Sequence, residues 1–191
     1  MGITNTWIAA GPGDWSDDAN WSLGHSPIEG EDPTFDATSI NNCNADDPTP
    51  TGVLTIAAGY SGTITQSSDM HISGYSQADG TFTGNTAKWI YCSGDFIKTG
   101  GTLTVNAVKI HFSGNCILSS NDDNSYFYEI FNDGNLTIIG TGTSKFCQVY
   151  RLTNENVINI SSEKTLTIEL FTSMKDRKST RLNSSHWITS R

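Results

Sequence analysis

The sequence predicts an all-β fold, a right-handed parallel β-helix (solenoid) with an N-terminal Trp-rich cap. Between Val53 and Phe171, short β-favouring runs recur every seven to ten residues. Gly, Asn, Asp and Ser separate these runs, and no stretch has the pattern of a helix. Three Trp also cluster near the N-terminus, between Gly and Pro residues. Evenly spaced short strands with similar turns are typical of stacked repeats.

The expected strands alternate apolar residues with Thr or other polar residues, so that alternate side chains enter a narrow core. They are 53–56, 62–65, 70–72, 80–83, 88–92, 95–97, 102–105, 109–112, 126–131, 136–139, 145–150, 157–160 and 166–170. A Gly-Thr-apolar-Thr pattern at 62–65, 80–83 and 101–104 places a turn glycine before a strand each time. Three strands in each coil of about twenty to twenty-five residues predict roughly five or six coils.

An antiparallel β-sandwich is the alternative architecture, because strands spaced eight to twelve residues apart also describe it. Such a fold favours tight hairpins with Asn-Gly or Asp-Gly at the turn. Only Asp79-Gly80 and Asp133-Gly134 fit that pattern. The scarcity of hairpin signals favours the β-helix.

The chain divides into three expected segments. Residues 1–50 form the N-terminal cap segment, and residues 51–175 form a β-solenoid that we expect to be truncated at its C-terminal end. Residues 176–191 resemble the translation of a short-read sequencing adapter, so we expect this tail to be non-native and exclude it from the fold. Four of the eleven Lys and Arg lie in this tail.

The charge of the chain limits its partners. The net charge is −9, and it becomes more negative without the tail. A phosphate backbone would be repelled, so we expect no nucleic-acid binding. No apolar run reaches the roughly eighteen residues of a membrane span, and no secretory signal is visible. The acidic composition, rich in Gly, Thr, Ser and Asn, suits a virion or an extracellular or cell-surface location.

The N-terminal cap carries the densest pattern in the chain. Trp7, Trp15 and Trp21 lie within fifteen residues, and we expect them to cover the open end of the solenoid. The pattern is Trp-x-x-x-Gly-x-Gly-x-Trp-x-Asp-x-x-Asn-Trp-Ser at 7–22, then Pro27, Asp32, Phe35-Asp36, Cys43 and the run 54–65. It resembles the opening of a family of β-helical proteins found in phage particles and in bacterial or archaeal surface proteins.

This resemblance covers roughly residues 6–105 and departs at Pro33-Thr34, where the family has an apolar alternation. It implies a right-handed parallel β-helix used as a structural or adhesive module, without catalytic residues to transfer. We therefore expect a non-enzymatic module of a virion tail, appendage or cell-surface protein. Its partners would be other virion or surface subunits and a glycan or host-surface receptor.

The alternative functions are a polysaccharide-degrading β-helix enzyme whose active half is missing and a carbohydrate-binding module. Paired carboxylates at 17–18, 46–47 and 122–123 are the candidates for catalysis, since glycosidases use two carboxyl groups. Adjacent loop residues point in different directions, however, and solvated loop charge is the common explanation for such pairs. No Gly-x-Ser-x-Gly motif or phosphate loop is present in the sequence.

A calcium ion is the one cofactor that the sequence suggests. Asp14, Asp17, Asp18 and Asn20 offer oxygen ligands within one short loop, although the Gly and the distal Glu of an EF-hand are missing.

Aromatic residues supply the candidate ligand-binding surface. Trp89 and Tyr91 alternate along one run and must share a face, where they would stack on sugar rings. Tyr126 and Tyr128 form a second such pair, and Tyr60 and Tyr75 lie at similar positions. Packing in the core is the alternative role for these rings.

The cysteines lack the Cys-x-x-Cys spacing of a zinc site. Cys92 and Cys116 are separated by about one coil and are either a disulfide between neighbouring coils or buried thiols.

Overall fold

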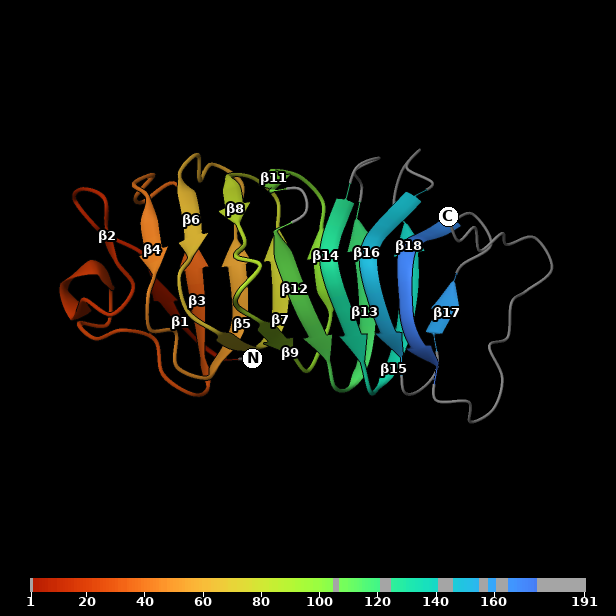
Figure 1. Cartoon of the computed structure of the whole chain (residues 1–191). Coiled ribbons are helices and arrows are strands. Elements are labelled where there is room, and N and C mark those ends of the chain that lie inside the picture. The colour runs from red at the N-terminus through yellow and green to blue at the C-terminus, as the bar shows by residue number, and fades with distance from the viewer. Residues whose placement is uncertain are drawn as a thin grey trace.

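The protein is a parallel β-solenoid, and its strands lie side by side along an elongated rod (Figure 1). The structure is a computed structural model, and it describes residues 2–104, 107–120, 125–140, 146–154, 158–160 and 165–174. All pairings between its described strands are parallel, so the β-helix prediction is confirmed and the antiparallel sandwich is wrong. The helical content described is one 3₁₀ turn at Asp18–Asn20.

The strands form three columns along the rod. The first contains β1 (Ile3–Thr6), β3 (Glu31–Phe35), β5 (Thr51–Ile56), the end of β7 (Met70–Gln77), β10 (Phe96–Lys98), β13 (Asn115–Ser120), β15 (Asn135–Gly140) and β17 (Ile158–Ile160). The second contains the start of β7, then β9 (Ile90–Cys92), β12 (Val108–Phe112), β14 (Ser125–Asn132), β16 (Phe146–Asn154) and β18 (Thr165–Met174). The third contains β2 (Gly13–Asp14), β4 (Cys43–Ala45), β6 (Thr63–Gln66), β8 (Thr81–Thr83) and β11 (Thr102–Leu103).

Two details of this arrangement differ from the sequence expectation. The stack begins inside residues 1–50, since β1 pairs with β3 and β3 pairs with β5. The third column ends at β11 among the described residues, so the described strands that follow it belong to two columns instead of three. The Gly-Thr-apolar-Thr pattern found in this column does not recur in the sequence after residue 104.

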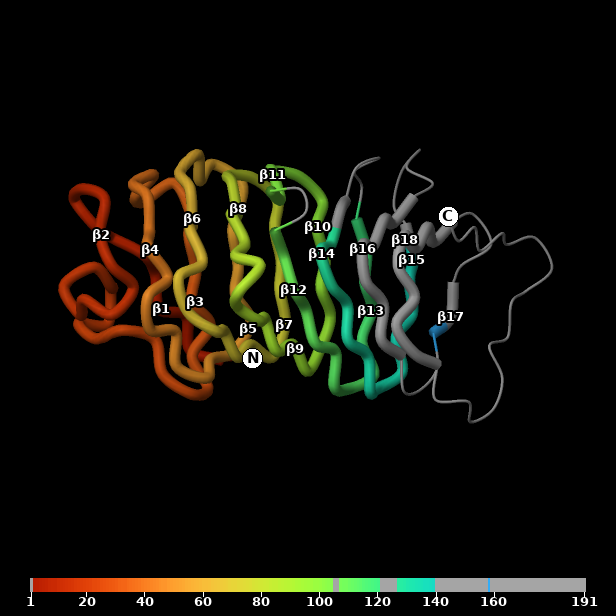
Figure 2. Tube along the Cα trace, viewed as in Figure 1, coloured from red at the N-terminus to blue at the C-terminus, as the bar shows by residue number. Residues whose placement is uncertain are grey.

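Paired residues on neighbouring coils are about twenty positions apart, as in His71 with Tyr91 and Tyr91 with His111. The backbone trace in Figure 2 shows the coils following one another along the rod. Hydrogen bonds between neighbouring coils join residues 20 to 22 apart, such as Trp89 with Asp69 and Ile117 with Asp95. Glycines allow the corners to stack closely. A Cβ on Gly94 would overlap the carbonyl oxygen of Ser73, and one on Gly114 would overlap that of Ser93. Side chains at these corners would therefore force neighbouring coils apart.

The core is a narrow stack of apolar side chains. Leu54 and Ile56 of β5, Ile64 of β6 and Phe82 of β8 are fully buried, as the alternation predicts. Tyr75 lies in the core and stacks on Phe96, with ring centroids 4.1 Å apart and an interplanar angle of 4°. Tyr60 is also buried. The core role is therefore confirmed for these two tyrosines.

The three Trp side chains are buried and pack against one another within the cap segment. The backbone of this segment forms the red end of the rod in Figure 1. All three are at most 1% exposed and surround the buried ring of Phe35. The indole N–H of Trp21 donates to the carbonyl oxygen of Trp15 at 2.7 Å, and that of Trp7 donates to the carbonyl oxygen of Asn41 at 3.1 Å. The Trp-rich cap predicted from the sequence thus covers the first layer of the solenoid.

Candidate functional site

A row of aromatic side chains runs along the outer face of the second column. His71, Tyr91, His111 and Phe131 occupy equivalent positions on β7, β9, β12 and β14. His71 stacks face to face on Tyr91, with centroids 4.4 Å apart. The next contacts are edge-to-face, at 5.5 Å between Tyr91 and His111 and 4.6 Å between His111 and Phe131. We call these four residues the aromatic row.

A second row lies beside the first. Ser73, Ser93 and Ser113 follow the aromatic row by two residues, so they are on the same outer face, and all three are exposed. The coils are held in register at this corner because the N–H of Ser93 donates to the Ile72 carbonyl and that of Ser113 donates to the Cys92 carbonyl. We call these three residues the serine row.

Both rows belong to a repeat that our sequence analysis missed. The segments His-Ile-Ser-Gly, Tyr-Cys-Ser-Gly, His-Phe-Ser-Gly and Phe-Asn-Asp-Gly begin at residues 71, 91, 111 and 131. The signal was present in the sequence as an aromatic or imidazole ring three residues before a glycine. A search for self-similarity at a period of twenty would have found it.

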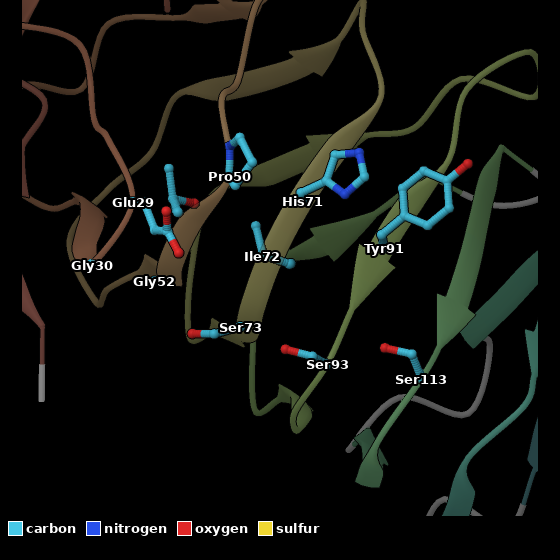
Figure 3. Close-up of a pocket in the computed structure, with 11 residues that line it drawn as sticks. Glu29, Gly30, Pro50, Gly52, His71, Ile72, Ser73, Tyr91, Ser93 and Ser113 are labelled. Atoms are coloured by element: carbon cyan, nitrogen blue, oxygen red, sulfur yellow. The ribbon is translucent and has the colours of Figure 1, made fainter.

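An open groove of about 450 Å³ follows these rows along the rod (Figure 3). Its lining comes from successive coils, beginning with Glu29 and Gly30 of the cap segment and ending at Ser113. Between these ends lie Pro50, Thr51, Gly52, His71, Ile72, Ser73, Tyr91 and Ser93. The groove therefore presents two ring side chains, several hydroxyl groups and one carboxylate to a ligand.

Thr51 is the polar group of this groove whose hydrogen bonding is incomplete. Its side chain is buried, with 8% of the residue exposed, and its Oγ1 has no hydrogen-bond partner. A buried hydroxyl without a partner costs about 1–3 kcal/mol, so such groups normally have a partner. Glu29, by contrast, is exposed at the cap end of the groove.

The structure separates the two residues predicted to bind carbohydrate. Tyr91 lines the groove, whereas Trp89 lies beside it, with ring centroids 6.4 Å apart. They do share the outer face, as the alternation predicts. The ammonium of Lys109 lies 4.3 Å from the centre of the Trp89 ring and 3.9 Å from a carboxylate oxygen of Glu129. Lys109 therefore lies over the ring of Trp89, and Tyr91 is the member of the pair that lines the groove.

The predicted calcium ligands take part in local hydrogen bonds of the cap. The carboxylate of Asp17 accepts from the N–H of Ala19, and that of Asp18 accepts from the N–H of Ser26. Asp14 accepts from the Asn44 amide, and the Asn20 amide donates to the Asp14 carbonyl. Within the described residues, no group of three or more His, Cys, Asp or Glu is placed to hold a metal ion. These interactions shape the loop that carries Trp15 and Trp21.

The acidic pair at 46–47 also contributes to the cap. Asp46 accepts hydrogen bonds from the N–H of Ser16 at 3.0 Å and from its hydroxyl at 2.7 Å. Partial burial acts to raise the pKa of Asp46, but these hydrogen bonds outweigh it and lower the pKa below its usual value. The predictions for Asp122-Asp123, for the side chain of Tyr126 and for the tail at 176–191 lie outside the described residues.

Cys92 and Cys116 are free buried thiols that lie close together at a corner of the coil. The Sγ of Cys116 lies 3.9 Å from the carbonyl oxygen of Cys92. The sequence left open whether Cys92 and Cys116 form a disulfide or remain buried thiols, and in the structure they are buried thiols. Burial raises the pKa of Cys92 to about 12, which makes this thiol unreactive near neutral pH.

The fold places this chain among the parallel β-solenoids. No protein family matches the sequence, and no significant match was found among curated proteins or solved structures. Among the described residues, none forms a helix long and apolar enough to cross a membrane.

Proposed function

We propose that this protein is a non-enzymatic adhesive module of a virion appendage or a cell-surface protein. The aromatic row and the serine row would bind a glycan chain laid along the rod. The carrying observation is the open groove in which the rings of His71 and Tyr91 lie beside exposed serine hydroxyls. Aromatic rings offer apolar surface to sugar rings, while hydroxyl groups exchange hydrogen bonds with sugar hydroxyls.

The solenoid supports this role because it repeats a ring and a serine hydroxyl on three successive coils, at residues 71–73, 91–93 and 111–113. Parallel strands are about 4.8 Å apart, so successive rings and hydroxyls present a regular ladder to a polymeric ligand. Several weak contacts along one polymer add to a useful avidity. The resemblance of the Trp-rich opening to virion and surface proteins agrees with a role outside the cell.

A polysaccharide-degrading activity has less support from this groove. Hydrolysis of a glycosidic bond by the usual mechanisms needs two carboxyl groups on opposite sides of the bond. Glu29 is the one carboxylate among the residues that line the groove. A glycan retained by the protein should therefore be recovered with its chain length unchanged. Size-exclusion chromatography of the recovered polysaccharide measures this length.

The binding test compares the full chain with two variants on a glycan array and in affinity electrophoresis. Tyr91→Ala should weaken retention about tenfold, because it removes the ring that lines the groove. Ile40→Ala is the matched control, since Ile40 is an exposed apolar residue of the cap outside the groove. Far-UV circular dichroism confirms that both variants keep the fold. Equal retention by Tyr91→Ala and the control would contradict the proposal.

A further inference from the structure

We propose that the cap end of the groove binds a positively charged amino sugar of the glycan. In this arrangement the sugar ring lies on the free face of His71, and its ammonium group lies near Glu29. This inference rests on the proposed glycan binding and specifies the class of sugar. Three independent features of the groove support it.

The first feature is that the stacked part of the aromatic row ends at the groove. Tyr91 covers one face of His71, and the two rings belong to paired strands, β9 and β7. The opposite face of His71 is therefore directed toward the preceding coil. The groove lining there is provided by Pro50 and Gly52, as Figure 3 shows. His71 is exposed, so its free face is accessible to a ring-shaped ligand.

The second feature is the hydroxyl of Thr51. It lines the same end of the groove, is buried and lacks a hydrogen-bond partner in the protein. A sugar hydroxyl or amine would satisfy this group and remove the cost of leaving it unpaired. The hydroxyl therefore favours a polar ligand over an apolar ring at this position.

The third feature is the charge at the cap end. Glu29 contributes a carboxylate to the groove, and no ion pair joins it to a cation within the described part of the chain. The net charge of −9 adds a negative field around it. A carboxylate beside aromatic faces attracts an ammonium group and repels acidic sugars.

The test measures binding of the full chain to four oligomers of equal length by calorimetry, with the amino groups protonated. These are oligomers of β-linked glucosamine, its N-acetylated form, glucose and lysine. We expect the glucosamine oligomer to bind about tenfold more tightly than the two neutral sugars. Glu29→Gln should abolish this preference while leaving the glucose oligomer unaffected. Asp47→Asn is the control, because Asp47 is an exposed carboxylate outside the groove.

Two further variants test the ring and the hydroxyl. Thr51→Val keeps the shape of the side chain and should weaken binding of the charged and the neutral sugar oligomers a few-fold. His71→Ala should weaken binding of the sugar oligomers more than binding of the lysine oligomer. Equal binding of the charged and neutral sugars, or an unchanged preference in Glu29→Gln, would overturn the amino-sugar inference and leave glycan binding intact. A lysine oligomer that binds as tightly as glucosamine would overturn it in favour of a general cation site. Absence of binding to any oligomer and to the glycan array would overturn both proposals.

Discussion

The rings of His71 and Tyr91 lie 4.4 Å apart and within 8° of parallel, although twenty residues separate them in the sequence. Pairing of β7 with β9 brings them together, so the contact reports the register of two successive coils. An aromatic pair of this kind contributes about 0.5–1.5 kcal/mol beyond the area that it buries.

This contact gives the first prediction. A double-mutant cycle with His71→Ala and Tyr91→Ala should show a coupling of about 0.5–1 kcal/mol in the free energy of unfolding. Urea denaturation followed by circular dichroism measures it. The same cycle with Ser73→Ala and Ser93→Ala should show almost no coupling, because exposed serines on neighbouring coils lack a ring contact. Strictly additive effects for His71 and Tyr91 would show that the rings do not stack in solution.

The second prediction concerns the cap. Trp21 contacts Trp7, Trp15 and Phe35 and donates a hydrogen bond to the Trp15 carbonyl. Trp21→Ala should lower the free energy of unfolding by about 3–5 kcal/mol, because it opens a cavity over the first coil. Hydrogen exchange should increase most in β1 and β3. Leu23→Ala, at an exposed position nearby, should change stability by less than about 0.5 kcal/mol. Equal losses of unfolding free energy in the two variants would argue against a tightly packed Trp-rich cap.

Much of the fold could be predicted from local sequence pattern. Thr and apolar residues alternate in the runs around Ile56, Ile64 and Phe82, and the structure buries the apolar member of each. The grouping of three short strands per coil predicted coils of about twenty to twenty-five residues, and paired residues such as His71 and Tyr91 are twenty apart. Both signals are local, because each strand needs one apolar face and each corner needs a residue that permits close stacking.

The groove depended on information that a local pattern does not contain. A one-residue shift in register would exchange inward and outward side chains, so the sequence left open which tyrosines face the core. Tyr75 faces inward, whereas Tyr91 faces outward. Glu29, Thr51 and His71 come from separate parts of the chain and line one groove only when the cap and the coils are stacked. Long-range contacts of this kind depend on the complete stack.

The third prediction tests a buried polar group at the corner between the first and third columns. The amide of Gln77 donates to the carbonyl oxygens of Asp79, Gly80 and Thr102, and its oxygen accepts from the Tyr75 hydroxyl at 2.9 Å. Gln77→Leu should lower the free energy of unfolding by about 3 kcal/mol, because several buried groups lose their partners. Tyr75→Phe removes one of these hydrogen bonds and should cost about 1 kcal/mol. Urea denaturation measures the free energy of unfolding of both variants. If Gln77→Leu were as stable as Tyr75→Phe or more stable, the hydrogen bonds of Gln77 would not stabilise this corner.

The fourth prediction follows from the buried thiol of Cys92. Burial is the main cause that raises its pKa from 9.0 to about 12 in the folded protein. The neutral thiol is therefore favoured by folding, and its contribution to stability is complete below about pH 9. Above that pH the unfolded chain ionises first, so the contribution is lost as the pH rises toward 12. The loss reaches at most about 1.4 kcal/mol per pH unit.

Cys92→Ala isolates this effect from the other groups that ionise at high pH. The variant should be less stable than the wild type at neutral pH, because it removes a buried sulfur, and the difference should shrink as the pH rises above 9. Ser93→Ala, at the exposed neighbouring position, should follow the wild-type curve at every pH. Urea titrations at a series of pH values measure the three curves. A constant gap between Cys92→Ala and the wild type would mean that the thiol ionises equally in both states and is accessible to water in the folded protein.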